Sequence, residues 1–308
     1  LGLAISVTCI FWSFSNFDYQ IFLEHVKTID YYLFILASLL LVFSVFIRSI
    51  RWLLFFKDEE QQNLTLLGLF KNEMIGYFGN NIFPLRLGDL LRVSKMSKKT
   101  NMSQSYLFGT IVTERIIDIV SLFILLLLFA VFFWNNTVLM IMFSKFKLIT
   151  VTKLFIYLCI LAPILLVGYF LIKKNNLFNW SLFAAAFSNI RGYRKILKIL
   201  TLSLLIWVIY LLNIIIISHS MMAINNFSIM DSMILLFLVT LSIVILPSAP
   251  GAIGTFQAAV IFVMTSNLLG YKESEASSFA IILHAYSYIT YSIIGGYFFL
   301  KSNLKLRK

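Results

Sequence analysis

The sequence predicts an all-α, polytopic membrane protein, and its composition and its apolar runs are the two observations that predict it. Of the 308 residues, 60% are hydrophobic and only 12% are charged. Soluble domains are nearer half apolar and about a quarter charged. A helix needs about 20 apolar residues to cross roughly 30 Å of hydrocarbon. Runs of that length cover residues 31–56, 103–134, 150–172, 199–219, 229–247, 251–270 and 276–300.

A shorter apolar run at 1–17 brings the expected number of crossings to about eight. No segment between the runs is long enough and polar enough to form a separate soluble domain. We therefore expect a single transmembrane domain over 1–308.

The basic residues are placed unevenly along the chain. The formal net charge is +12, and most of the 25 basic residues lie in or beside 48–99, 173–198 and 301–308. By the positive-inside rule these segments are cytoplasmic. Eight crossings of the cell (inner) membrane with both termini in the cytoplasm fit this pattern. Charge confined to membrane-flanking segments predicts anionic lipid rather than nucleic acid as the partner.

Cysteine and histidine give no sign of metal or redox chemistry. Cys9 and Cys159 both lie in apolar runs, where a thiol packs as a small hydrophobic group. The three histidines do not cluster, and no glycine-rich nucleotide motif is present. We expect no disulfide, no metal and no cofactor. Because there is no nucleotide motif, we expect an ion gradient or simple equilibration to drive any transport.

The longest connection, 57–102, turns apolar again over 64–83 and reads as an interfacial or re-entrant helix pair near 64–95. Pro84 is expected to end one helix and begin the next. Asn81 precedes this break and can pair with freed backbone groups.

Beyond the break, charged side chains recur every three residues, which predicts one helical stripe made of Arg86, Asp89 and Arg92. Either this stripe faces a substrate site or it is the solvated face of an amphipathic helix at the membrane surface.

A second interruption lies near 246–258, within the Pro/Gly-interrupted segment 246–270. Pro250 and Gly254 stand four residues apart, as do Pro84 and Gly88, and Pro247 and Gly251 add to the break. Backbone irregularity at membrane depth is tolerated where it is buried in protein or lines a watery cavity. Breaks at corresponding places in two halves predict a transporter-type site between repeats.

Charged residues also enter a third apolar run. Glu114 and Asp118 share a helix face, and Arg115 can pair with Asp118. Each charge at the bilayer centre would cost about 2.5–3.5 kcal/mol, so these groups need partners or water. Alternatively 116–134 alone spans the membrane, which leaves Glu114 and Arg115 at the cytoplasmic interface, level with Arg86 and Asp89.

The last span carries a polar stripe that includes His284. Such a stripe most often packs against a neighbouring helix. A proton carrier is the alternative, because histidine titrates near neutral pH.

Four motifs in order resemble the flippase-like lysylphosphatidylglycerol synthase transmembrane region family. They are Arg51-Trp52, then N-x-x-P-x-R-x-G-D-x-x-R from Asn81 to Arg92, E-R-x-x-D from Glu114 to Asp118, and P-x-x-P-G-x-x-G-T-F-Q from Pro247 to Gln257.

The resemblance implies about eight spans and, in bifunctional members, movement of an aminoacylated phospholipid between leaflets. Other relatives are linked to hopanoids or to polyprenyl-phosphate sugars, often beside glycosyltransferases. Three positions depart from the family pattern: Asp89 and Gln257 stand where glutamate is usual, and His284 where arginine is frequent. If Gln257 and His284 replace an ion pair, both partners have been neutralised together, which keeps a buried pair balanced.

The expected function is therefore lipid translocation by a protein that is not an enzyme. Arg86 and Arg92 would bind a lipid phosphate, while Asp89, Glu114 and Asp118 would hold the arginines or meet a cationic head group. Asn81, Arg115, Gln257 and His284 complete the expected site.

Two alternatives remain. One is an enzyme of lipid-linked glycan synthesis, although no acidic DxD motif is present. The other is a non-catalytic partner of a synthase or a glycosyltransferase.

Overall fold

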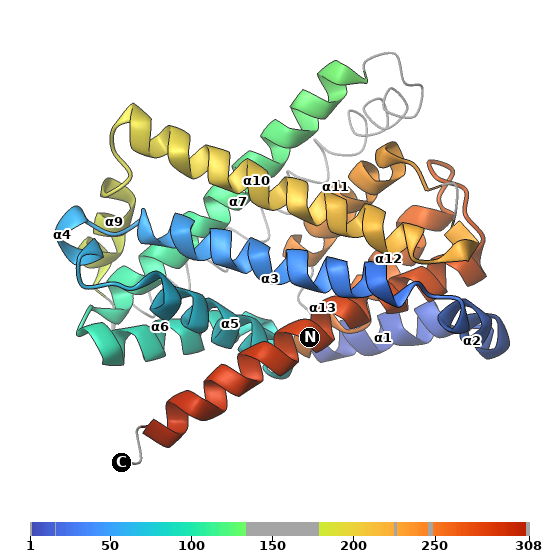
Figure 1. Ribbon diagram of the computed structural model, residues 1–308, viewed down its shortest axis with the longest axis horizontal. Helices are drawn as coiled ribbons and strands as arrows, with labels where there is room; N and C mark the ends of the chain where they lie inside the picture. The colour runs from blue at the N-terminus through green and yellow to red at the C-terminus, as the bar shows by residue number, and fades with distance from the viewer. Residues whose placement is uncertain (1, 16, 134–178, 225–226, 246–248, 306–308) are drawn as a thin grey trace.

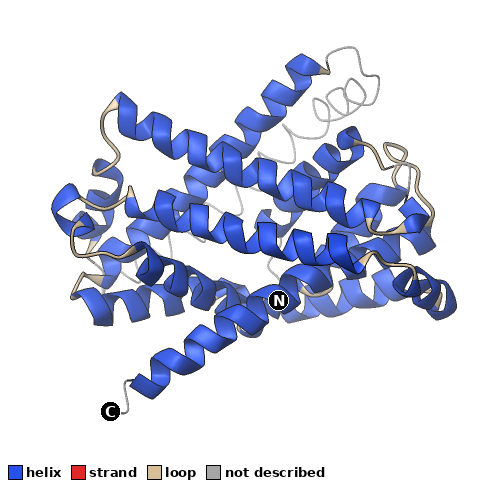
Figure 2. Cartoon of the chain, in the orientation of Figure 1, coloured by secondary structure: helices blue, strands red, loops and turns tan. Residues whose placement is uncertain are grey.

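The computed structural model describes residues 2–15, 17–133, 179–224, 227–245 and 249–305, and throughout these ranges every regular element is a helix (Figures 1 and 2). The helices are α1 Gly2–Phe14, α2 Tyr19–Lys27, α3 Tyr31–Leu53, α4 Asp58–Gln61, α5 Leu66–Ile82, α6 Gly88–Thr100, α7 Gln104–Phe132, α9 Trp180–Ser188, α10 Tyr193–His219, α11 Ile229–Ile245, α12 Thr255–Thr265 and α13 Glu273–Lys305. Three short 3-10 turns join them, η1 Pro84–Arg86, η2 Met222–Ile224 and η3 Pro250–Ala252.

The all-α fold predicted from the sequence is confirmed. Four helices, α3, α7, α10 and α13, are long and apolar enough to cross a membrane, and α1, α11 and the segment around α12 are shorter apolar helices. Two of the predicted spans need comment. The run 150–172 lies outside the described residues. The run 251–270 holds α12, whose 11 residues extend only about 16 Å, so it is half a crossing and not a span.

Side-chain caps fix where several helices begin. The Asp30 carboxylate accepts from the backbone N–H of Tyr32 at 2.9 Å and of Leu33 at 3.3 Å, which starts α3. Thr65 accepts from the N–H of Gly68 at the start of α5. These oxygens satisfy N–H groups that have no partner within the helix.

The long helices α3 and α10 run antiparallel through the middle of the molecule (Figure 1). The N–H of Asp30 donates to the carbonyl of Ser220, and at the other end of the pair Arg51 donates to Ser203. The start of α3 therefore lies beside the end of α10.

The described chain contains the same sequence of elements twice. One unit is α3, a hairpin of α5 and α6 folded at η1, and α7; the other is α10, a hairpin of α11 and α12 folded at η3, and α13. Because α3 and α10 are antiparallel, the two hairpins enter from opposite ends of the molecule (Figure 1). Their tips, η1 and η3, touch. The two backbone breaks thus meet between the two units.

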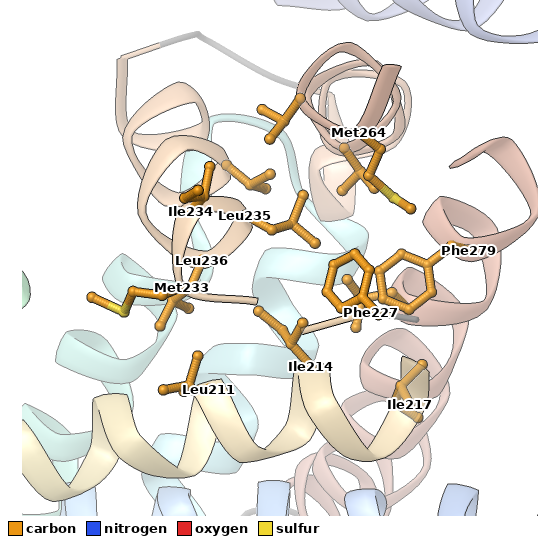
Figure 3. Close-up of a cluster of buried hydrophobic side chains, with 14 of the residues drawn as sticks. Leu211, Ile214, Ile217, Phe227, Met233, Ile234, Leu235, Leu236, Met264 and Phe279 are labelled. Carbon is orange, nitrogen blue, oxygen red and sulfur yellow. The ribbon is translucent and has the colours of Figure 1, made fainter. Parts of the chain in front are cut away.

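A large apolar core surrounds the second hairpin. It is formed mainly by α10, α11, α12 and α13, with Ile214, Met233, Leu236, Met264 and Phe279 among its members (Figure 3). Large apolar side chains such as Tyr32 and Phe132 are more than 80% exposed. A protein that buries a core and also exposes such side chains on its long helices has a lipid-facing surface.

Candidate functional site

The first hairpin folds at a proline and a glycine. Phe83 is extended because the next residue is Pro84, and this ends α5. Pro84 begins η1, as predicted from its missing N–H. At Gly88 the chain enters α6, and a Cβ there would overlap the backbone carbonyl oxygen of Gly76 and the backbone nitrogen of Asn80. Only glycine allows α5 and α6 to approach so closely.

The predicted stripe of Arg86, Asp89 and Arg92 is wrong. Arg86 has a left-handed backbone, with φ of 56°, and α6 begins only at Gly88. Arg86 therefore leaves the helical face that carries Asp89 and Arg92. Its side chain is exposed, lines a cavity and forms no ion pair with any described residue.

Arg92 has a different environment from the one predicted. It is 1% exposed, and its Nη2 donates to Glu73 at 2.5 Å and to Glu114 at 2.9 Å. Its guanidinium carbon lies 3.9 Å from the centre of the Trp52 ring. The sequence predicts that Arg92 faces either solvent or a lipid phosphate. In the structure it contacts two carboxylates and an indole ring instead. Arg92 holds the first hairpin against α7.

Glu114 and Asp118 do have the buried partners that the sequence requires. Glu114 is 1% exposed and accepts from Arg48 at 3.2 Å. Asp118 accepts from Arg51 at 2.6 Å and from Arg48 at 3.0 Å. Glu114 is thus surrounded by protein, and arginines rather than water compensate its charge.

Arg115 joins this group to the hairpin. Its side chain is 31% exposed and pairs with Asp89 at 3.3 Å and with Asp118 at 3.3 Å. We call the whole set the ion cluster; its members are Arg48, Arg51, Arg92, Arg115, Glu73, Asp89, Glu114 and Asp118. Four arginines face four carboxylates, so the cluster is neutral when all eight are ionised.

A cavity of about 350 Å³ lies beside the ion cluster and between the two units. Its polar wall includes Arg48, Tyr77, Arg86, Arg115 and His284. Its apolar wall includes Leu41, Ile214, Leu235, Val239 and Ile243. The cavity can hold a small polar group at one side and apolar matter at the other, and its size is that of a ligand pocket.

The second break supplies part of the cavity wall, and Gln257 and His284 join it to α13. The Gln257 amide nitrogen lies 2.7 Å from His284 Nδ1, so the two side chains form a buried pair. Gln257 Oε1 accepts from the N–H of Gly254, and His284 Nε2 lies 2.9 Å from the carbonyl of Gly251.

Together these partners fix the hydrogen positions. The Gly254 N–H requires the Gln257 oxygen on its side, so the amide N–H₂ faces His284 Nδ1, which must then be unprotonated. The His284 Nε2–H donates to Gly251. A neutral histidine satisfies every partner, and this geometry favours a positioning role over proton carriage.

Replacing Gln257 with alanine is expected to lower the free energy of unfolding by about 1–2 kcal/mol, because the cap of α12 is lost and His284 Nδ1 loses its donor. Thermal unfolding in detergent micelles measures this. Gln62→Ala, at an exposed position, is the matched control and should change nothing. Equal losses in both variants would contradict the assigned role.

The remaining predicted residues also lie close to the breaks. Asn81 donates to the carbonyl of Tyr288 and to Ser292, both at 3.0 Å, so it pairs with α13 as well as preceding the break. Pro250 begins η3, and Gly251 and Gly254 have φ of 62° and 86°. Pro247 lies outside the described residues.

Sequence reasoning missed Arg48, Glu73 and Tyr77. Arg48 binds Glu114 and Asp118 and lines the cavity, and its signal was a charge inside the apolar run 31–56. Glu73 binds Arg92 inside the first hairpin, and its signal was a single acid within the apolar stretch 64–83. Tyr77 stacks on Tyr291 with ring centres 4.3 Å apart, and both line the cavity. A tyrosine in an apolar run carries no such signal.

Comparison with known proteins finds similarity to one membrane-protein family over most of the chain. The profile of the lysylphosphatidylglycerol synthase transmembrane region matches residues 1–295. The UPF0104 membrane protein MJ1078 of Methanocaldococcus jannaschii is 28% identical over 229 residues, which cover 72% of this chain and 93% of that protein. No solved structure matches the chain.

Proposed function

Because the chain belongs to the lysylphosphatidylglycerol synthase transmembrane region family, we propose that it moves a phosphate-bearing lipid between the leaflets of a membrane. The lipid head group would occupy the cavity while its acyl chains stay against the apolar wall and the surrounding bilayer. The basic end of the molecule, where α3 ends and α7 begins, would face the cytoplasm of a cell membrane.

One observation carries the proposal: Arg86 lines the cavity without an ion-pair partner among the described residues. An unpaired arginine beside an apolar wall is costly unless water or a ligand solvates it. Its guanidinium fork matches the oxygens of a phosphate. The cluster arginines already have carboxylate partners, which makes Arg86 the cation best placed to bind an anion.

The two-unit arrangement supports transport over a fixed binding role. The cavity is lined by both units, and the hairpin tips that meet beside it come from opposite ends of the molecule. Discontinuous helices that meet at mid-depth between inverted units are the arrangement that many transporters use for their substrate sites. Membrane lipids are the partners in this proposal, and no enzymatic step is part of it.

Arg86→Ala is expected to slow lipid transfer about ten- to hundredfold, since a charge-assisted hydrogen bond contributes about 1.5–3 kcal/mol. The measurement is transfer of fluorescent glycerophospholipids across vesicles that contain the purified protein. Because Arg86 has no ion-pair partner, the thermal unfolding of the variant should match that of the wild type.

Arg191→Ala is the control, because Arg191 is an exposed arginine at the basic end and does not line the cavity. It should transfer lipid at the wild-type rate. Unchanged transfer in Arg86→Ala would reject the role of Arg86. A wild-type protein that transfers no glycerophospholipid, but purifies in a stable complex with a synthase or a glycosyltransferase, would be an accessory subunit instead.

A further inference from the structure

We infer that the transported lipid is anionic, with one phosphodiester and an otherwise uncharged, hydroxyl-bearing head group, and that cationic head groups are excluded. This inference rests on the proposed function and names its substrate class. Three features carry it: the position of every acidic residue, the single unpaired charge in the cavity, and the uncharged tyrosines that line the same cavity.

No carboxylate is available to meet a cationic head group. All 13 acidic residues of the chain lie in the described ranges. Four of them belong to the ion cluster, where each pairs with at least one arginine. The other nine lie in α2 or α4 or at the beginnings of α2, α3, α11 and α13. None of the described residues that line the cavity is acidic, whereas three are arginines.

The charge that remains is a single positive one. Arg48 and Arg115 reach the cavity wall from the ion cluster, and carboxylates behind them compensate their charge. Arg86 forms no ion pair with any described residue; Asp89 and Asp118 act on it only at longer range, and their charge is already balanced by the arginines of the ion cluster. One phosphodiester would therefore neutralise the cavity. A zwitterionic lipid would leave an ammonium group near Arg86, and the lysyl ester of phosphatidylglycerol would bring two positive charges against one negative phosphate.

That surplus charge could not be screened readily. Ile214, Leu235 and Val239 also line the cavity, so it is less polar than water and like charges repel more strongly inside it. Like-charge juxtaposition at a recognition site is an effective means of rejecting a wrong ligand. The cavity thus selects on the net charge of the head group.

The rest of the polar wall suits hydroxyl groups. Tyr77 and Tyr291 stack at 4.3 Å with an interplanar angle of 10°, and neither hydroxyl has a hydrogen-bond partner among the described residues. A phenol can donate and accept, which matches a glycerol or sugar hydroxyl. The two rings face each other, so each shields one face of the other from any ammonium group.

The test compares three probe lipids that carry the same labelled acyl chain: phosphatidylglycerol, phosphatidylcholine and the lysyl ester of phosphatidylglycerol. In vesicles with the wild-type protein, phosphatidylglycerol should cross at least about tenfold faster than the lysyl ester. In Arg86→Gln the rate for phosphatidylglycerol should fall and the ratio should approach one. Arg191→Ala should keep both the rate and the ratio.

Binding provides a second measurement that does not require transfer. Purified protein is equilibrated with an equimolar mixture of the three lipids, and the bound lipids are measured by mass spectrometry. Enrichment of phosphatidylglycerol that disappears in Arg86→Gln supports the inference.

Equal or preferential binding and transfer of the lysyl ester would overturn the inference while leaving the proposed function standing. Selective binding without transfer of any lipid would support the head-group class and reject the transport function. The two failures are therefore distinguishable.

Discussion

Replacing Glu114 with glutamine is expected to lower the free energy of unfolding by about 3–5 kcal/mol, the cost of removing one partner from a buried ion pair. Glu114 is 1% exposed and forms ion pairs with Arg48 and Arg51 of α3 and with Arg92 of α6. Glutamine keeps the size of the side chain but supplies no negative charge. The cluster would then hold four arginines against three carboxylates, with little access to water.

Thermal unfolding in detergent micelles, followed by size-exclusion chromatography, measures this effect. Glu59→Gln is the control, because Glu59 is exposed and stands outside the ion cluster. Surface substitutions of this kind usually change stability by less than about 0.5 kcal/mol. Similar stability of the Glu114 and Glu59 variants would show that the cluster does not stabilise the fold.

Alanine at Gly88 is expected to destabilise the first hairpin, at the upper end of the about 1–3 kcal/mol that overpacking costs. The new Cβ would overlap the backbone of Gly76 and Asn80, and backbone atoms cannot move aside as a side chain can. The helices α5 and α6 would have to separate. Arg86, only two residues away, would move with them, so lipid transfer should fall as well.

Gly68→Ala is a control within the same hairpin. A Cβ there would approach only Thr65 Oγ1 and Lys99 Nζ, which are the ends of movable side chains. The shift of Thr65 Oγ1 weakens the cap of α5, and the better helix propensity of alanine, up to about 1 kcal/mol, offsets this loss, so the variant should stay close to the wild type in stability. A Gly88→Ala protein that unfolds and transports like Gly68→Ala would refute the close crossing.

The sequence predicts where the chain must break, because proline and glycine act through local backbone geometry. Pro84 and Pro250 each begin a 3-10 turn, as their missing N–H groups suggest. The pairing of Gln257 with His284 could also be predicted from the sequence. A buried polar group needs a partner, and both residues depart from the family pattern.

The sequence could not predict the backbone conformation of Arg86 or which residues pair with each other in the ion cluster. A three-residue spacing implies a stripe only if the helix is continuous, and the left-handed backbone at Arg86 interrupts it. Burial of Glu114 required partners, but local spacing cannot say that they come from α3 and α6. The sequence alone therefore suggests a phosphate as the partner of Arg92, whereas in the fold Arg92 pairs with Glu73 on the other arm of its hairpin.

The ion cluster also constrains how the protein is made. Arg48 and Arg51 are synthesised with α3, whereas their partners Glu114 and Asp118 emerge from the ribosome later, with α7. Until α7 is made, the two arginines near the C-terminal end of α3 lack these carboxylate partners, so the final packing of this end of α3 waits for a helix that is translated afterwards.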